Sequence, residues 1–315
     1  MKKSLALFLL MAVNALGLMA QQITFVPQWT PQAQFAGFYA AFEKGFYAAA
    51  GLDVNISHLS LNSKESSADL LANGDCNIAG MQITQGITRR ADGTRLVNVM
   101  QITQTVGLCC LAHTPIKTPS DLNGFKIARW LQGYSEICEI IAAREGIDVD
   151  WTYFFNSSTN LFIYGAVDAT LCYSFSELIR LYQAMGSINE DNLIRFGDFY
   201  QWPEDGLFVT EDYYQKNKET IDKFVDASIR GWNWAADNRD EAIKIVMRYT
   251  SEAHISTNVS LERMMLDEYL RLQENPRTGK RDYSAVTPET FSQISEELYN
   301  HGFANRLVEY RELIR

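Results

Sequence analysis

The residues that could do chemistry form short aromatic and amide groups rather than a catalytic motif. Trp29, Gln32 and Gln34 come directly after Ile23–Val26, a short apolar segment that predicts a strand. A tryptophan offers a flat face to an aromatic ring, and a glutamine amide both donates and accepts hydrogen bonds. The spacing therefore predicts a site for a small, flat, polar molecule.

Similar residues follow other predicted strands. Because ligands of open α/β sheets bind at the carboxyl ends of the strands, these groups are expected to meet at one site. The candidate ligand contacts are Trp29, Gln32, Gln34, Tyr39, Gln82, Thr84, Trp130, Tyr134, Tyr173, Glu177 and Tyr200. Structural alternatives stay open, since Trp29 could cover the edge of a lobe, Tyr39 could belong to the core and Glu177 could cap a helix in solvent.

The cysteines and histidines do not predict a metal site. The five cysteines contain no C-x-x-C pair, and the four histidines are scattered without an H-E-x-x-H grouping. Burial as small apolar side chains is the simplest interpretation of the cysteines. A Cys138–Cys172 disulfide stays possible in an oxidising compartment.

The N-terminus predicts export. Met1-Lys2-Lys3 is followed by the apolar run Ser4–Leu18, and Ala20 precedes a plausible cleavage point, so residues 1–20 are expected to be a cleavable signal peptide. The run is shorter than the roughly 20 residues of a spanning helix, and no cysteine for lipid attachment follows it. We therefore expect a periplasmic protein.

The charge balance limits the classes of partner that the protein is expected to bind. Lys and Arg number 28 against 38 Asp and Glu, a net charge of −10. An acidic chain of this kind is not expected to bind nucleic acid, and we expect a monomer whose ligand is a small molecule.

Strands and helices alternate along the chain, which predicts an α/β fold. Residues 96–111 form a strand-rich stretch, continuous enough to be a buried sheet element, and the proline-containing segment 113–121 follows it. A second irregular stretch covers 197–206. Two such linkers predict two lobes with two hinge crossovers. The first lobe is expected to hold residues 21–112 plus 207–315 and the second residues 113–206. Asp198, Tyr200, Trp202 and Asp205 could line the hinge side of the cleft between them.

Five segments in order resemble one family of binding proteins. They are WTPQAQFAGFYAAFEKGFYAAAGLDVNI, LLANGDCNIAGMQITQG, IKTPSDLNGFKIARW, GAVDATLCYSFSELIRLY and DGLFVTEDYYQKNKETIDKFVDASIRGWNWAADNRDEAI. This pattern resembles the NMT1-like (thiamine-pyrimidine-precursor) family of periplasmic substrate-binding proteins. The resemblance implies a type II periplasmic-binding-protein fold, a ligand between the lobes, no cofactor, and an ABC permease or a membrane sensor as partner.

The same resemblance includes an enzyme branch, the hydroxymethylpyrimidine-phosphate synthases, which consume pyridoxal phosphate and a histidine. Those enzymes carry Lys and His where this chain has Met81 and Gln85, and a cysteine-rich iron site where residues 200–207 hold no cysteine. A Schiff base needs an amine, which Met81 lacks. We therefore expect a receptor rather than an enzyme.

The favoured ligand is a small aromatic heterocycle such as an aminopyrimidine, which a carboxylate at Glu177 could recognise through two hydrogen bonds. One alternative is a small anion such as a sulfonate or nitrate, which would need a cation at the strand ends; Arg129 is the nearest candidate. Another is an orphan sensor subunit that reports on a ligand without transporting it.

Overall fold

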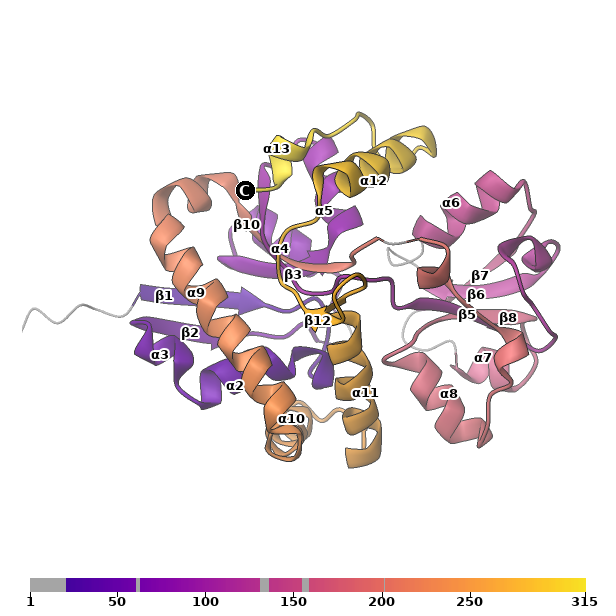
Figure 1. Ribbon diagram of the computed structural model, residues 1–315, viewed down its shortest axis with the longest axis horizontal. Helices are drawn as coiled ribbons and strands as arrows, with labels where there is room; N and C mark the ends of the chain where they lie inside the picture. Colours follow the sequence, from indigo (N-terminus) through magenta and orange to yellow (C-terminus); the bar gives the residue numbers. More distant parts are fainter. Residues whose placement is uncertain (1–20, 61–62, 131–135, 155–158, 201) are drawn as a thin grey trace, which may run out of the picture.

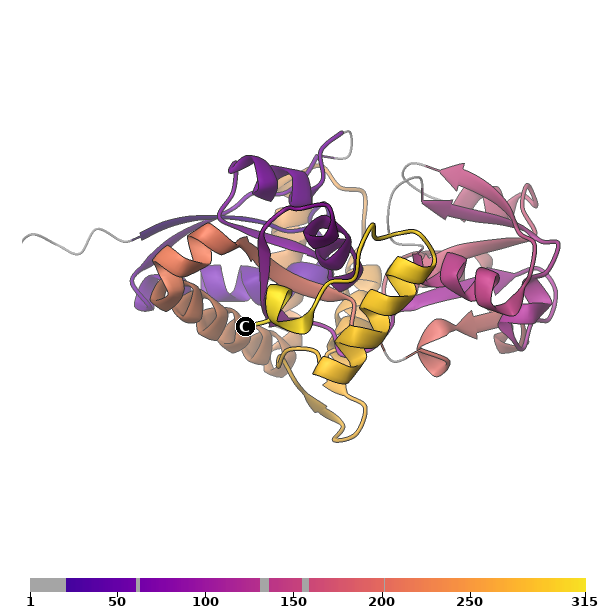
Figure 2. The same ribbon diagram turned by 90° about the horizontal axis from the view of Figure 1, so that it is seen from above.

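In the computed structural model the described residues are 21–60, 63–130, 136–154, 159–200 and 202–315. They form two mixed five-stranded sheets flanked by helices, which confirms the predicted fold of two α/β lobes. The lobes lie at opposite ends of the long axis in both views (Figures 1 and 2). The predicted signal peptide lies outside the described residues, and no helix within them is long and apolar enough to span a membrane.

Both sheets have the same arrangement. In each, a parallel three-stranded core continues into a strand that runs antiparallel to it. The first sheet, in spatial order, is β2 (Leu52–Ile56), β1 (Gln21–Val26), β3 (Ile78–Gln82), β10 (Asp205–Thr210) and β4 (Leu96–Gln101). The second sheet is β7 (Asp150–Phe154), β6 (Lys126–Trp130), β8 (Ala169–Tyr173), β5 (Leu108–Ala112) and β9 (Leu193–Arg195).

Helices cover the two sheets unequally. Those of the first lobe are η1 (Ala33–Phe35), α2 (Ala36–Glu43), α3 (Phe46–Ala49), α4 (Ser67–Asn73), α5 (Ile83–Ala91), α9 (Glu211–Asp237), α10 (Arg239–Glu252), α11 (Val259–Leu272), α12 (Pro288–Asn300) and α13 (Tyr310–Leu313). The second lobe holds η2 (Pro119–Leu122), α6 (Glu136–Glu145), α7 (Thr159–Ile163), α8 (Glu177–Met185), η3 (Glu190–Asn192) and η4 (Phe196–Asp198). A two-stranded ribbon of β11 (Glu274–Asn275) and β12 (Lys280–Arg281) follows α11.

The first crossover lies earlier than predicted. The strand-rich stretch 96–111 is not one sheet element, because β4 belongs to the first sheet and β5 to the second. The chain therefore crosses between the lobes at residues 102–107. Ile102 and Thr103 are almost completely buried, and a buried crossing needs no proline or polar signal. The proline-containing segment 113–121 instead connects β5 to β6 on the surface of the second lobe.

The second crossover lies close to its predicted place. The chain leaves the second lobe after η4 and enters the first sheet with β10, so it crosses at residues 199–204. The predicted boundary after residue 206 falls inside β10, because Asp205 and Gly206 already pair with β3. The chain thus crosses twice, as predicted, at 102–107 and 199–204.

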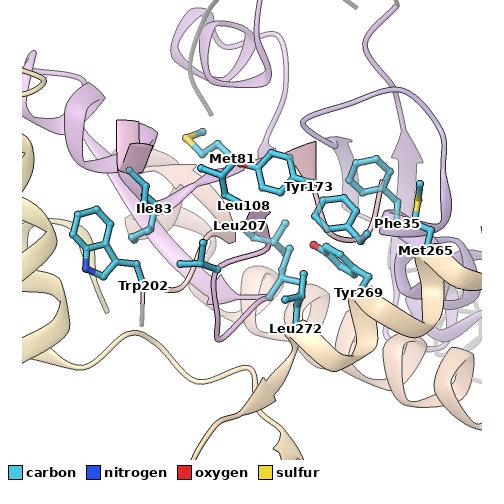
Figure 3. Close-up of a cluster of buried hydrophobic side chains, with 14 of the residues drawn as sticks. Phe35, Met81, Ile83, Leu108, Tyr173, Trp202, Leu207, Met265, Tyr269 and Leu272 are labelled. Carbon is cyan, nitrogen blue, oxygen red and sulfur yellow. The ribbon is translucent and has the colours of Figure 1, made fainter. Parts of the chain in front are cut away.

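An apolar cluster joins the lobes beside these crossovers (Figure 3). Leu108 and Tyr173 come from the second sheet, whereas Met81, Leu207 and others come from the first. Tyr269 and Leu272 of α11 pack against the same cluster. The two lobes therefore share one buried core at the hinge side.

Helix α9 crosses α2 at very short range. A Cβ atom added at Gly231 would lie 2.1 Å from the carbonyl oxygen of Gly37 and 2.7 Å from Cβ of Ala41. At Gly37, an added Cβ would lie 2.1 Å from the ring of Trp232. This contact is possible only because both positions lack a side chain.

Gly231→Ala is expected to force α2 and α9 apart, because backbone rather than a flexible side chain occupies the space that the methyl group needs. We expect a loss of about 2–3 kcal/mol in the free energy of unfolding and a Tm lower by about 4–10 °C. Gln215→Ala, an exposed change on the same helix, serves as the control in thermal unfolding. An unchanged Tm for Gly231→Ala would contradict the close crossing.

Candidate functional site

A cavity lies between the two lobes at the carboxyl ends of their parallel strands. Its volume is about 40 Å³, room for a few water molecules. Its walls are Gln28, Trp29, Gln32, Gln34, Gln82, Trp130, Tyr173, Phe175, Ser176, Glu177 and Asp205. Side chains nearly fill the site, so a ligand the size of a heterocycle can enter only when the lobes or their side chains separate.

Aromatic rings form one wall of this cavity. The ring of Tyr173 lies 5.4 Å from that of Trp130 and 5.2 Å from that of Phe175, both in tilted geometry. Phe175 contacts Tyr269 of the first lobe edge-on, at 5.2 Å. Trp29, which is half-buried, supplies aromatic area from the first lobe. Such surfaces bind a flat ring with a small loss of side-chain entropy.

A carboxylate and two amides form the polar wall. Asp205 Oδ2 accepts hydrogen bonds from Gln34 Nε2 at 2.8 Å and from the hydroxyl of Tyr269 at 2.8 Å. Gln32 Nε2 in turn donates to Gln34 Oε1 at 2.6 Å. The three side chains are buried and connected in a row from β10 to the chain after β1.

One hydrogen bond crosses between the lobes inside the cavity. Gln82 Nε2, at the end of β3, donates to the hydroxyl of Tyr173 at the end of β8. Gln82 is also the N-cap residue of α5, where its backbone N–H donates to Gln85 Oε1 at 3.3 Å. This bond closes the cavity, and any ligand that reaches the strand ends has to replace or bypass it.

Glu177 starts α8 at the second-lobe wall. Its Oε2 accepts a hydrogen bond from the backbone N–H of Tyr173 at 3.0 Å. Burial raises the pKa of the Glu177 carboxyl, and the hydrogen bond from Tyr173 partly opposes that rise. One carboxylate oxygen is thus committed to the backbone, which leaves less of the group for a ligand than the sequence predicted.

A buried histidine supports Trp29 from behind. His58 Nδ1 lies 2.8 Å from the carbonyl oxygen of Trp29, and Nε2 lies 2.8 Å from the hydroxyl of Tyr39. Burial lowers the pKa of His58 to about 4, so the ring is neutral at pH 7. With Nδ1 carrying the hydrogen, His58 donates to Trp29 and accepts from Tyr39, which fixes the backbone of Trp29 against the first lobe.

Most predicted ligand contacts line the cavity. The structure brings together Trp29, Gln32, Gln34, Gln82, Trp130, Tyr173 and Glu177. Three others lie elsewhere because they have packing roles: Tyr39 stacks on Tyr249 at 4.0 Å, Thr84 is buried in the first turn of α5, and Tyr200 packs against Trp202. Tyr134 lies outside the described residues.

Four further residues line the cavity. Asp205 was assigned only to the hinge side of the cleft, whereas Gln28, Phe175 and Ser176 were not singled out. Gln28 precedes Trp29, and Phe175 and Ser176 lie between Tyr173 and Glu177. Their position at the same strand ends was the available signal, because a loop that contributes one residue to a site usually contributes its neighbours.

The cavity contains carboxylates but no cation. Among the described residues that line it, Glu177 and Asp205 are acidic and none is Arg or Lys. Arg129, the predicted candidate for an anion site, instead pairs with Glu139 and lies over the ring of Tyr153 at 4.6 Å. An anion bound here would therefore meet two carboxyl groups, whereas the predicted cation lies elsewhere.

The groups that distinguish the enzyme branch remain absent from this site. Met81 is completely buried in β3, and the side chain of Gln85 accepts from the backbone N–H of Gln82 at 3.3 Å.

All five cysteines are buried and unpaired, so Cys138 and Cys172 form no disulfide here. Within the described part of the chain, no three His, Cys, Asp or Glu side chains come together as a metal site.

The family model described as "NMT1/THI5 like" matches residues 32–242. The chain belongs to the NMT1/THI5-like family. Among its relatives, the riboflavin-binding protein RibY of Chloroflexus aurantiacus is 24% identical over 299 residues, 93% of this chain and 84% of RibY. The formylaminopyrimidine-binding protein of Halalkalibacterium halodurans is 24% identical over 260 residues, 79% of this chain and 76% of that protein.

Solved structures show how widely this NMT1/THI5-like chain shares its fold. The periplasmic aliphatic sulphonate binding protein SsuA from Escherichia coli superposes with a TM-score of 0.67 at 16% identity, covering 94% of this chain and 92% of SsuA. The alkanesulfonate-binding protein SsuA from Xanthomonas axonopodis pv. citri, bound to MOPS, gives 0.68 at 12% identity, with 93% and 98% covered. These likenesses establish the periplasmic-binding-protein fold.

Glu204 lies next to the cavity and ties the two crossovers together. Its Oε2 accepts from the backbone N–H of Gly107 at 2.6 Å. Burial raises the pKa of Glu204 well above its usual value, and the neighbouring charge of Asp205 adds to the rise. The unfolded chain, with an ordinary carboxyl, releases this proton at lower pH than the folded chain does. Glu204 therefore lowers stability progressively as pH rises above about 4.5.

Glu204→Gln is expected to raise the free energy of unfolding at pH 7, because a neutral amide keeps the hydrogen bond to Gly107 without the cost of ionisation. The gain should shrink toward zero near pH 4. Denaturant unfolding across this pH range measures it, with the exposed Glu219→Gln as control. A Glu204→Gln protein that is less stable at pH 7 would overturn this account.

Proposed function

We propose that this protein is the solute-binding protein of an ABC importer and captures a flat nitrogen heterocycle, neutral or cationic, without chemistry. The observation that carries the proposal is a cavity with aromatic walls and amide ends in which the charged lining residues described are Glu177 and Asp205, both acidic. Such a cavity suits amino groups and ring N–H donors and opposes anions.

The relatives support this ligand class. Riboflavin and formylaminopyrimidine, named for two relatives that are each 24% identical, both contain a flat nitrogen ring. The sulfonate-binding proteins share the fold at 12–16% identity, which carries no information on the ligand. We therefore favour an aminopyrimidine-like ring over a sulfonate for this chain.

In the proposed mechanism, the separated lobes expose the strand ends, and the ligand stacks between Trp29 on the first lobe and Trp130 or Tyr173 on the second. Closure then replaces the bond between Gln82 and Tyr173 by bonds through the ligand. The ligand shifts the lobes only as far as its affinities for the open and closed forms differ. We propose that a membrane permease reads the closed form in the periplasm, after removal of residues 1–20.

A thermal-shift screen with aminopyrimidines, riboflavin, pyridoxal derivatives, sulfonates and nitrate tests the ligand class. A ligand at 100 times its Kd adds about 2.7 kcal/mol to stability, which raises Tm by several degrees. We expect the heterocycles to stabilise the protein and the anions to have no effect.

Trp29→Ala should abolish the ligand-induced shift while the ligand-free Tm changes little, because Trp29 is only half-buried. Trp234→Ala is the matched control, a half-buried tryptophan outside the cavity. Stabilisation by anions alone would refute the heterocycle proposal, and normal binding by Trp29→Ala would remove Trp29 from the site.

A further inference from the structure

The row of side chains formed by Asp205, Gln34 and Gln32 has a fixed direction. An oxygen that accepts two hydrogen bonds carries no proton of its own, and Asp205 Oδ2 accepts from both Gln34 Nε2 and the hydroxyl of Tyr269. Even in a protonated carboxyl the proton would therefore lie on Oδ1. The group that Gln34 turns toward Asp205 must be its NH₂.

The orientation of Gln34 determines that of Gln32. With its NH₂ turned to Asp205, Gln34 presents its carbonyl oxygen to the next amide, 2.6 Å from Gln32 Nε2. Gln32 must then donate, which places its own carbonyl oxygen at the free end of the row. No described residue donates a hydrogen bond to Gln32 Oε1, although Gln32 is 6% exposed and lines the cavity.

We propose that Asp205 fixes the hydrogen-bond polarity of Gln34 and Gln32, so that the site selects heterocycles with an amino or N–H donor facing Gln32 Oε1. This inference rests on the proposed function, which it sharpens from a heterocycle to one with a donor at this position. Asp205 is a positioning residue for Gln32, since Gln34 lies between them.

The alternative polarity has a physical cost. A ligand with only an acceptor at this position would face the lone pairs of Gln32 Oε1, and relief would require both amides to rotate. Rotation of Gln34 would turn its carbonyl oxygen toward Oδ2 of Asp205, which in the ionised carboxylate has no hydrogen to donate. A buried polar group left unpaired in this way reduces affinity by about tenfold or more.

Three pyrimidines test the selection: 4-amino-2-methylpyrimidine as donor, 4-methoxy-2-methylpyrimidine as acceptor and 2,4-dimethylpyrimidine as neither. Calorimetry on the wild-type protein should show that the amino compound binds at least about tenfold more tightly than the methoxy compound. Equal affinities for the two would overturn the proposal.

Two variants break the row at different points. Asp205→Leu removes the carboxylate, and Gln34→Met removes the connecting amide at similar length, so in both Gln32 can turn its NH₂ toward a ligand. The ratio of affinities should fall to about 1–3. Gln104→Met, a half-buried glutamine in the first crossover, should retain the wild-type ratio.

A second substitution that restores the preference would show that Asp205→Leu acts through the orientation of Gln32 and not through general loss of structure at the site. In Asp205→Leu/Gln34→Glu, the carboxylate at position 34 accepts from Gln32 without needing Asp205, so the preference for the amino compound should return to at least tenfold. A wild-type ratio in Asp205→Leu, or no recovery in the double variant, would contradict the role of Asp205.

A measurement without ligand keeps the two proposals apart. With ¹⁵N-glutamine labelling, Asp205→Leu should shift the side-chain amide signal of Gln32, assigned by its loss in Gln32→Met, although Asp205 and Gln32 share no hydrogen bond. An unchanged Gln32 signal would refute the row. If no pyrimidine binds the wild-type protein, both the proposed heterocycle ligand and the proposed selection among heterocycles are refuted. The amide signal still shows whether Asp205 orients Gln32.

Discussion

The structure depends on one buried junction, where the two crossovers between the lobes are hydrogen-bonded to each other. Thr103 Oγ1 of the first crossover accepts from the backbone N–H groups of Glu204 and Asp205, at 3.2 and 3.0 Å. The Glu204 carboxylate accepts from the backbone N–H of Gly107 in the first crossover, and the carbonyl oxygen of Asp205 accepts from the backbone N–H of Ile102 at 2.7 Å. Buried backbone groups of two non-sheet segments are thereby satisfied, as a dry interior requires.

This junction also sets the position of the ligand site. Asp205 is the first residue of β10, so the bonds that hold its backbone to the first crossover place its side chain at the strand ends. The carboxylate of the polar wall therefore lies directly after the second crossover in the chain. In the proposed closure, Trp130 and Tyr173 of the second lobe move relative to Asp205 and Gln34 of the first lobe.

The sequence predicted the features that depend on local pattern. Strand ends carry Trp29, Gln82 and Tyr173, and the rule that ligands bind there brought seven of the eleven candidate contacts to the cavity. Tyr39 and Tyr200 lie outside the cavity, where they pack against Tyr249 and Trp202, because an aromatic side chain looks the same in sequence whether it faces a ligand or the core. The orientation of a side chain depends on contacts with residues far away in the sequence, and the local sequence pattern carries no information about them.

The first crossover shows the same limit for the fold. Proline and polar residues mark segments exposed to water, so the pattern pointed to 113–121, a surface connection. The real crossing is largely buried, and several of its polar groups bond to residues far along the chain, as in the bond from Gly107 to Glu204. A buried crossing that contains β-branched residues and no proline looks like a strand in sequence.

The site chemistry distinguishes this protein from structures that it resembles closely in shape. A TM-score of 0.67 to a sulfonate-binding protein shows that the same two-lobed frame supports an anion site elsewhere. In this chain the frame carries Asp205 at the hinge and Glu177 at the start of α8, while Arg129 of β6 is paired with Glu139. The proposed preference for a neutral or cationic ring rests on these two acids and on the position of Arg129. Ligand class in this fold is thus decided by a few charges at strand ends, which change independently of the frame that presents them.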